Sequence, residues 1–218
     1  MRDNTLHPRP LERYTLLFWD FDGVIKESVE VKTEAYVALF AHAAPALAAR
    51  IREHHEAHGG MSRFEKIPIY LGWVGERADP HNVAHYCELF ARAVRQRVID
   101  SPWVPGAREY LQTHHARQPF VMLTATPQEE IENILHALGI APWFREVHGA
   151  PTQKAAAIAA TLTRLRCPAA EALVIGDSVS DYEAARSASV DFLLRLTAYN
   201  GQLQRQHQGA QCEDFLDG

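Results

Sequence analysis

Acidic side chains stand at the ends of two short apolar segments of the sequence. Asp20 and Asp22 close the segment TLLFWD, and Asp177 closes ALVIGD, with Asp181 one helical turn later. In open α/β sheets, ligands bind beyond the carboxyl ends of the strands. Several carboxylates in one dry crevice repel one another unless a hard cation neutralises them, and oxygen ligands suit Mg²⁺. The pattern therefore predicts a magnesium site.

An anion pocket is expected beside this metal. Thr124 ends a third apolar segment, Lys154 begins a helical pattern, and a further helix opens at Thr126. A lysine, a hydroxyl and the positive end of a helix together attract an anion. A metal, an anion pocket and a free carboxylate are the parts of a phosphoryl-transfer site.

Strand and helix patterns alternate along most of the chain. The expected strands are 15–20, 119–124, 145–148, 172–177 and 190–194, and the expected helices are 105–117, 127–138, 152–165 and 180–188. Thr126 and Ser180 are expected as N-caps because a glutamate follows each three residues later. The glutamine-rich stretch 201–211 is expected to be an exposed polar connection. This alternation predicts a doubly wound, Rossmann-like parallel sheet.

One interval departs from this alternation. Residues 24–99 contain only helical patterns, near 29–41, 45–58, 62–71 and 80–99, with a Gly59-Gly60 turn and a capping box at Ser62. A crossover between parallel strands needs only a dozen or more residues. We therefore expect a Rossmann-like core of residues 1–27 and 100–218, with an all-helical domain of residues 28–99 inserted into it.

The motifs resemble those of the haloacid dehalogenase superfamily of phosphatases. The sequence DFDGV at 20–24, Thr124, Lys154 and the sequence GDSVSD at 176–181 occur in the superfamily's order and on the expected elements. The resemblance covers the core, and the helical insertion stands where that superfamily carries its cap. Members of the phosphoglycolate phosphatase and β-phosphoglucomutase kind have this arrangement.

The resemblance implies a catalytic role for each of these residues. Asp20 would be the nucleophile that forms an aspartyl-phosphate, and Asp22 would be the general acid and base. Gly23 would permit the bend that turns both carboxylates toward one phosphate. Thr124 and the amide of Ala125 would hold the phosphoryl oxygens. Lys154 would offset negative charge on the nucleophile and the transferring group.

The resemblance also implies the metal ligands. Mg²⁺ would be held by Asp20, Asp177 and the backbone carbonyl of Asp22, with Asp181 orienting its surroundings. Asp22 favours phosphate-ester hydrolysis, because the dehalogenases and phosphonate hydrolases of the superfamily lack this second aspartate. A sugar phosphomutase of the β-phosphoglucomutase type shares all four motifs and stays an alternative, as does a non-catalytic metal-binding module.

Specificity is expected to come from the inserted helices. The loop after Gly59-Gly60 would close over the site, where Arg63 or Lys66 would meet a second anionic group or sugar hydroxyls. The alternative is that both side chains lie on the solvated face of a helix. The sequences FDGVIKES at 21–28, KTEA at 32–35 and GGMSRFEK at 59–66 also resemble phosphatases of bacterial surface-polysaccharide pathways, which suggests a sugar phosphate. Glu27 stands where many capped relatives have an aspartate, and Lys26 adds a cation at the junction with the cap, where its effect on the hinge is open.

Composition excludes several other classes. The net charge of −5 argues against nucleic acid as a partner, since phosphate backbones need a concentrated positive face. The three scattered cysteines fit a reducing compartment without disulfides. The first residues lack the apolar stretch of a signal peptide, and no segment has the length of a membrane helix. We expect a cytoplasmic enzyme that is a monomer or a weak dimer.

Overall fold

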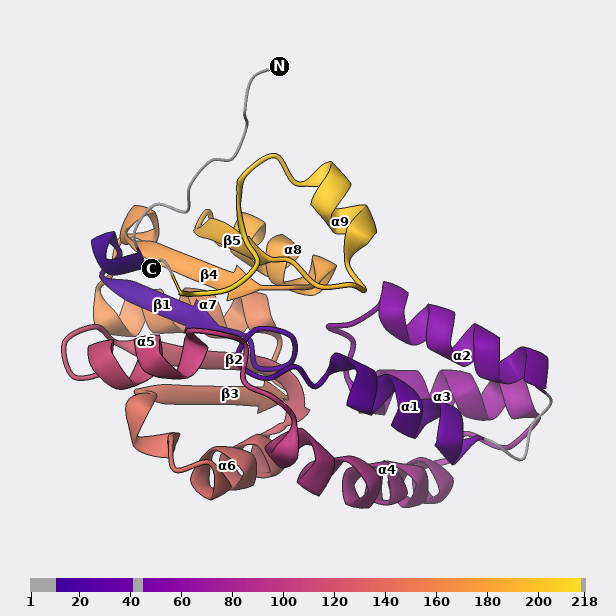
Figure 1. Ribbon diagram of the computed structural model, residues 1–218. Helices are drawn as coiled ribbons and strands as arrows, with labels where there is room; N and C mark the ends of the chain where they lie inside the picture. The colour runs from indigo at the N-terminus through magenta and orange to yellow at the C-terminus, as the bar shows by residue number, and fades with distance from the viewer. Residues whose placement is uncertain (1–10, 41–44, 217–218) are drawn as a thin grey trace.

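A parallel sheet forms the centre of the protein. The computed structural model describes residues 11–40 and 45–216. Its six strands run in the order β3-β2-β1-β4-β5-β6, and every neighbouring pair is parallel (Figure 1). The strands are β1 (Leu16–Trp19), β2 (Phe120–Pro127), β3 (Glu146–Ala150), β4 (Ala172–Gly176), β5 (Asp191–Arg195) and β6 (Ala210–Cys212). The predicted α/β class and Rossmann-like sheet are confirmed.

Alternate residues of the central strand β1 pack into two cores, one on each face of the sheet. Leu17 and Trp19 belong to one core, and Leu16 and Phe18 belong to the other. Successive side chains of a strand point to opposite faces, so a strand that is apolar throughout must be covered on both. The helices are α5 (Ala107–His114) and α6 (Gln128–Ala137) on the first face, and α7 (Lys154–Leu165) and α8 (Val179–Ser187) on the second.

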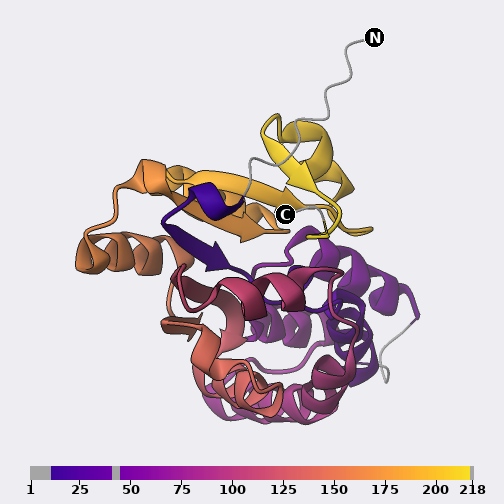
Figure 2. The same cartoon turned by 60° about the vertical axis from the view of Figure 1, so that its left-hand side comes forward.

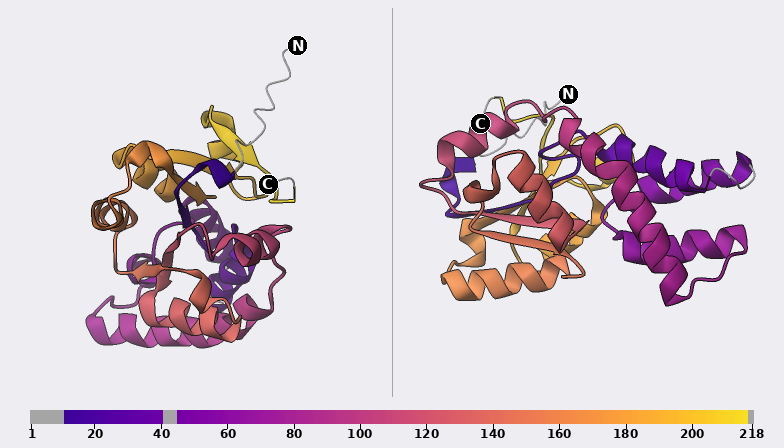
Figure 3. Two further views of the ribbon diagram at one scale, coloured as in Figure 1. Left: turned by 90° about the vertical axis from the view of Figure 1, so that its left-hand side faces the viewer. Right: turned by 90° about the horizontal axis from the view of Figure 1, so that it is seen from below.

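Between β1 and α5, the described residues form four inserted helices. They are α1 (Val29–Leu39), α2 (Pro45–Ala57), α3 (Arg63–Val74) and α4 (Pro80–Asp100). Tyr36 stacks on Phe90 at 4.0 Å between ring centroids and meets Tyr70 edge-on, so aromatic rings fill the space between the helices. The insertion lies beyond the carboxyl ends of the strands (Figure 1) and stands beside the core when seen from below (Figure 3, right). Figure 2 turns the side away from the insertion toward the viewer, and the inserted helices then lie behind the core. The predicted all-helical insertion is confirmed.

The C-terminal stretch differs from the expected polar connection. Residues 201–206 form the helix α9 (Gly201–Gln206), and residues 210–212 form the edge strand β6. The backbone of β6 pairs with β5, with Leu194 opposite Gln211. A helix and a strand therefore replace the exposed loop that the glutamine-rich composition suggested.

Two of the expected helix starts are also wrong. Strand β2 continues to Pro127, which pairs with Ala150 of β3, so α6 begins only at Gln128 and Thr126 is not its cap. The cap of α8 is Ser178 rather than Ser180, and its side chain and amide bind the carboxylate of Asp181. Pairing with the distant strand β3 decides where α6 begins, whereas the start of α8 is set locally by the capping box of Ser178 and Asp181.

The junction between the inserted helices and the core is firmly tied. Lys26 is 2% exposed, and its Nζ donates to the carbonyl of Ile99 at 2.9 Å while lying over the ring of Trp103. The next residue, Glu27, accepts two hydrogen bonds from the guanidinium of Arg195 at the end of β5. Lys26 therefore links the two chain segments that join the insertion to the core.

No helix in residues 11–40 and 45–216 is both long enough and apolar enough to cross a membrane. Cys87, Cys167 and Cys212 are all free thiols, as their spacing predicts.

Candidate active site

The end of β1 brings Asp20 to the carboxyl edge of the sheet. The amide of Asp20 donates to the carbonyl of Ile175 at 2.9 Å, so the ladder with β4 reaches this residue. The chain then turns tightly around the carbonyl of Phe21, which accepts three following amides. Gly23 has φ +75°, and a Cβ there would lie 2.3 Å from Oδ2 of Asp177. A glycine is therefore required both by the turn and by the carboxylate beside it.

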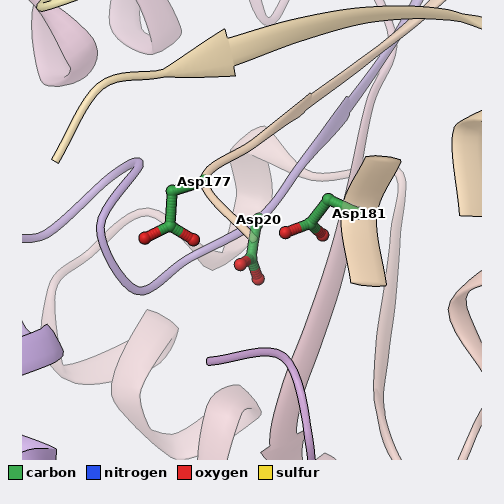
Figure 4. A group of neighbouring side chains, drawn as sticks. All are labelled: Asp20, Asp177 and Asp181. Atoms are coloured by element: carbon green, nitrogen blue, oxygen red, sulfur yellow. The ribbon is translucent and has the colours of Figure 1, made fainter. Parts of the chain in front are cut away.

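Three carboxylates meet at this edge. Asp20, Asp177 and Asp181 each offer an oxygen atom, and these atoms all lie within 4.8 Å of one another (Figure 4). Burial raises the pKa of Asp20 to about 7, against the opposing effect of Lys154. Burial and the neighbouring Asp20 raise the pKa of Asp177 well above its ordinary value. Burial and the neighbouring carboxylates both disfavour the ionised forms of these side chains, and a hard divalent cation would stabilise them.

Lys154 lies between two of these carboxylates. Its Nζ is 3.1 Å from Oδ1 of Asp20 and 2.6 Å from Oδ1 of Asp181. Burial alone would lower the pKa of Lys154, but the two carboxylates raise it above its ordinary value. Since α7 carries this lysine, β1 positions Asp20 and α8 carries Asp181, three separate segments of the sequence meet at one point.

Asp181 is fully engaged by its neighbours. Its Oδ1 binds Lys154, and its Oδ2 accepts the amide of Ser178 at 3.1 Å and its hydroxyl at 2.5 Å. A Cβ on Gly176 would lie 2.3 Å from the Cβ of Asp181, so the strand and the helix approach closely here. This arrangement holds Asp181 in a fixed orientation beside Asp20 and Asp177.

Asp22 turns toward a different set of partners. Its carboxylate accepts the hydroxyl of Ser28 at 2.6 Å and forms an ion pair with Lys32 of α1. Lys32 also donates to Oγ1 of Thr126 at 2.8 Å. Burial would raise the pKa of Asp22, but Lys32 and Ser28 lower it below its ordinary value. An ionised carboxylate therefore stands two residues from Asp20, held by the first inserted helix.

The end of β2 completes the floor of the site. Thr124 is 1% exposed, and its hydroxyl accepts the amide of Thr126 at 3.1 Å. The next residue, Ala125, lines the same cavity as Asp20 and Asp22. The register of β2 against β1, with Trp19 opposite Met122, brings these residues level with the carboxylates.

A cavity of about 370 Å³ separates this edge of the sheet from the inserted helices. Its walls include the acidic residues Asp20, Asp22 and Asp177 and the loop His58–Met61 between α2 and α3. A Cβ on Gly60 would lie 1.7 Å from Oγ of Ser180, so this loop rests directly on the start of α8. The site is therefore covered, and the loop expected to close over it forms part of its wall.

Comparison with known proteins places the chain in a family. Residues 14–189 match the family model for haloacid dehalogenase-like hydrolases. The chain belongs to this family. The predicted superfamily and the predicted enzyme class, a phosphatase of that superfamily, are thereby confirmed.

Individual relatives of this haloacid dehalogenase-like hydrolase point the same way. The chain is 26% identical over 208 residues to a phosphoglycolate phosphatase of Pseudomonas savastanoi pv. phaseolicola, covering 85% of this chain and 70% of the relative. Two solved structures share its fold. CbbY of Rhodobacter sphaeroides in complex with xylulose-(1,5)bisphosphate is 16% identical with a TM-score of 0.75, covering 94% of this chain and 96% of CbbY. A predicted phosphoglycolate phosphatase of Haemophilus somnus is 18% identical with a TM-score of 0.73, at 94% and 96% coverage.

The hydrolase's two cap candidates, Arg63 and Lys66, are buried rather than solvated. Arg63 is 5% exposed and forms a two-bond ion pair with Glu130 of α6, while also lining the cavity. Lys66 is 0% exposed and lies beside His55. The alternative that they form a solvated helix face is wrong. Their role toward a substrate stays a prediction.

The sequence patterns missed several residues that the hydrolase brings to the site. Lys32 and Ser28 hold Asp22, and Glu130 holds Arg63. The spacing of Ser28 and Lys32, one helical turn apart at the start of α1, was a usable signal, because both then face the preceding loop. Glu130 had no local signal, because its partner is 67 residues away.

Proposed function

We propose that the chain is a Mg²⁺-dependent phosphatase that hydrolyses a small sugar phosphate through an aspartyl-phosphate on Asp20. The observation that carries the proposal is the position of Lys154 between Asp20 and Asp181, with Asp177 beside them on the floor of a covered cavity. This arrangement combines a nucleophile, a fixed cation and surplus carboxylate oxygens at one place. Phosphoryl transfer needs these groups and little else, because positioning and charge stabilisation supply most of the catalysis.

The carboxylates fit a magnesium ion. Asp20, Asp177 and the backbone carbonyl of Asp22 would hold it, and Asp181 would orient its surroundings through Lys154 and Ser178. A bound Mg²⁺ supplies electrostatic stabilisation of the transferring phosphoryl group. The donor set is oxygen alone, and its buried charge exceeds what Lys154 can balance, as Mg²⁺ sites require.

In the first step, a carboxylate oxygen of Asp20 attacks phosphorus, and the bond between phosphorus and the ester oxygen breaks. Lys154 stabilises the charge on Asp20, and Thr124 with the amide of Ala125 holds the phosphoryl oxygens. Asp22 gives a proton to the leaving oxygen, which departs as the sugar hydroxyl.

In the second step, water attacks the phosphorus of the aspartyl-phosphate and its proton passes to Asp22. The bond to Asp20 breaks, which regenerates the nucleophile and releases inorganic phosphate. The ion pair with Lys32 favours the ionised form of Asp22 that must receive this proton. Asp22 thereby regains the proton that it gave in the first step.

The inserted helices would act as a cap, with residues 28–99 as the specificity domain and the remainder as the catalytic core. The contact of Gly60 with Ser180 supports this division, since the loop excludes bulk water where it rests on the core. Arg63 and Lys66 would recognise the part of the substrate beyond the phosphate. The similarity to a phosphoglycolate phosphatase and to CbbY supports a small phosphorylated metabolite as substrate.

Phosphate release from a panel of phosphomonoesters tests the proposal. We expect release that depends on Mg²⁺, is abolished by a chelator and is lost in Asp20→Asn with the fold intact by circular dichroism. Release without a divalent cation, or retained activity in Asp20→Asn, would contradict it. Interconversion of sugar phosphates with little free phosphate would instead show a mutase.

A further inference from the structure

A buried cation lies behind the wall of the cavity. Lys66 of α3 is 0% exposed, and its Nζ lies 2.7 Å from Nδ1 of His55 of α2 and 5.7 Å from the ring centroid of Tyr36. Among the described residues, no carboxylate forms an ion pair with Lys66. Burying an ammonium group without an anionic partner costs folding free energy. Lys66 therefore lowers the stability of the folded protein.

The other cations of this region are already matched. Lys32 is paired with Asp22, and Arg63 is paired with Glu130. Burial and the nearby ammonium of Lys32 together lower the pKa of Lys66 to about 7, against the opposing charges of Asp22 and Glu65. Within the part of the chain that the structure describes, Lys66 is therefore a cation near the cavity without an ion-pair partner. An anion bound in the cavity would stabilise its charge.

His55 connects Lys66 to the cavity. The imidazole of His55 lines the cavity together with Asp20 and Asp22, although only 4% of the residue is exposed. While Lys66 is protonated, its ammonium group can only donate a hydrogen bond, so Nδ1 of His55 accepts from it and the ring proton is then on Nε2. The donor that His55 can offer to the cavity is then an N–H group polarised by the cation behind it.

We propose that His55 and Lys66 form a recognition site for a second anionic group, a carboxylate or a phosphate, at the end of the substrate remote from the phosphoryl group that is transferred. The proposal rests on the proposed function, because Asp20 and His55 line one cavity and a single substrate would meet both. The substrate class is thus a phosphorylated sugar acid or a sugar bisphosphate rather than a neutral sugar monophosphate.

Competition against hydrolysis of p-nitrophenyl phosphate tests this site, because a competitor need not be turned over. The first pair of probes is 6-phosphogluconate and sorbitol 6-phosphate, which differ only in a carboxylate replacing a hydroxymethyl group. The second pair is fructose 1,6-bisphosphate and fructose 6-phosphate. We expect the doubly anionic probe of at least one pair to compete about tenfold better. The pair that shows the difference identifies the anion.

Variants then assign the preference to the two residues. Lys66→Met keeps the length of the side chain without its charge, and His55→Leu removes the donor, so the second variant serves if the first does not fold. In either variant, the ratio between inhibition by the doubly anionic probe and inhibition by the other member of its pair should fall to near one. Arg92→Met removes an exposed cation of α4 paired with Glu88 and should leave the ratio unchanged.

Equal inhibition by both members of each pair in the wild type would overturn the inference, as would a ratio that persists in Lys66→Met and His55→Leu. Either result could occur while p-nitrophenyl phosphate is still hydrolysed, and the proposed function would then stand. Absence of Mg²⁺-dependent hydrolysis of p-nitrophenyl phosphate would instead overturn the proposed function and this inference with it.

Discussion

The guanidinium of Arg63 forms two hydrogen bonds with the carboxylate of Glu130, at 2.8 and 2.5 Å, in a place where both side chains are nearly excluded from solvent. Arg63 begins α3 of the inserted helices, and Glu130 lies on α6 of the core. The ring of Phe90 lies under the guanidinium at 4.7 Å. One buried ion pair thus joins the inserted helices to the core at the edge of the cavity.

Glu130→Gln should therefore destabilise the protein. The substitution leaves the buried guanidinium of Arg63 without a negative partner, which costs about 3–5 kcal/mol. Glu88→Gln is the matched control, because it breaks an exposed ion pair with Arg92 and should cost less than about 1 kcal/mol. Urea unfolding of both variants measures the difference. If Glu130→Gln lowers the free energy of unfolding no more than Glu88→Gln does, the buried ion pair does not stabilise the contact between the inserted helices and the core.

Gly60→Ala should reduce activity by keeping the loop away from the core. The new Cβ would lie 1.7 Å from Oγ and 2.6 Å from Cβ of Ser180, so the loop must move. A displacement of about 1 Å can cost up to ~100-fold in rate, and we expect kcat/KM to fall by about tenfold or more. Gly59→Ala is the control, since its Cβ meets only the Cβ of Ser178 at 3.7 Å. Equal activity of the two variants would contradict closure by this loop.

Asp22→Asn should affect poor leaving groups more than good ones. An alkyl phosphate needs a proton on its leaving oxygen, so its kcat should fall by about 10²–10⁴. An activated aryl phosphate needs less protonation and should lose far less in its first step. The measurement compares kcat for p-nitrophenyl phosphate and for a sugar phosphate in the wild type and the variant. Equal losses on both substrates would argue against a role of Asp22 as the general acid.

Lys66→Met should stabilise the protein more at low pH than at high pH. Burial, with Lys32, lowers the pKa of Lys66 from 10.5 to about 7 against the opposing charges of Asp22 and Glu65. Below pH 7 both the folded and the unfolded chain hold the proton, and the full cost of burying the charge applies. From pH 7 toward 10.5 the folded chain releases the proton first, so this cost declines.

The stabilisation of Lys66→Met should accordingly be about 1–3 kcal/mol larger at pH 6 than at pH 9. Free energies of unfolding in urea at the two pH values give this difference, and the effects of other titrating groups cancel between the variant and the wild type. A stabilisation that does not change with pH, or that grows as the pH rises, would show that Lys66 is not a charged group in the fold below pH 7.

The sequence was sufficient for strands β1 to β5 and for the residues at their carboxyl ends. Strands such as Leu16–Trp19 and Ala172–Gly176 are continuous apolar segments because both of their faces are covered, and that pattern is local. The positions of Asp20 and Asp177 follow from it, since each stands directly after its strand. The family motifs are likewise short segments, so they could be recognised without knowledge of the fold.

Features that depend on contacts between distant segments could not be predicted. The strand Ala210–Cys212 is short, lies at an edge and is rich in polar residues, and only its pairing with β5 makes it a strand. The start of α6 is set by the pairing of Pro127 with Ala150 rather than by the capping pattern at Thr126. The partners of Asp22 and Arg63 depend likewise on how the inserted helices meet the core.

The covalent state of Asp20 during turnover tests the central claim most directly. Enzyme mixed with Mg²⁺ and substrate, quenched in acid within the first turnovers and digested, should yield the peptide that contains Asp20 with the mass of one added phosphoryl group. The adduct should be absent from Asp20→Asn and from enzyme treated with a chelator. Mg²⁺-dependent phosphate release from the wild type with no such adduct, or with the adduct on another residue, would contradict the account.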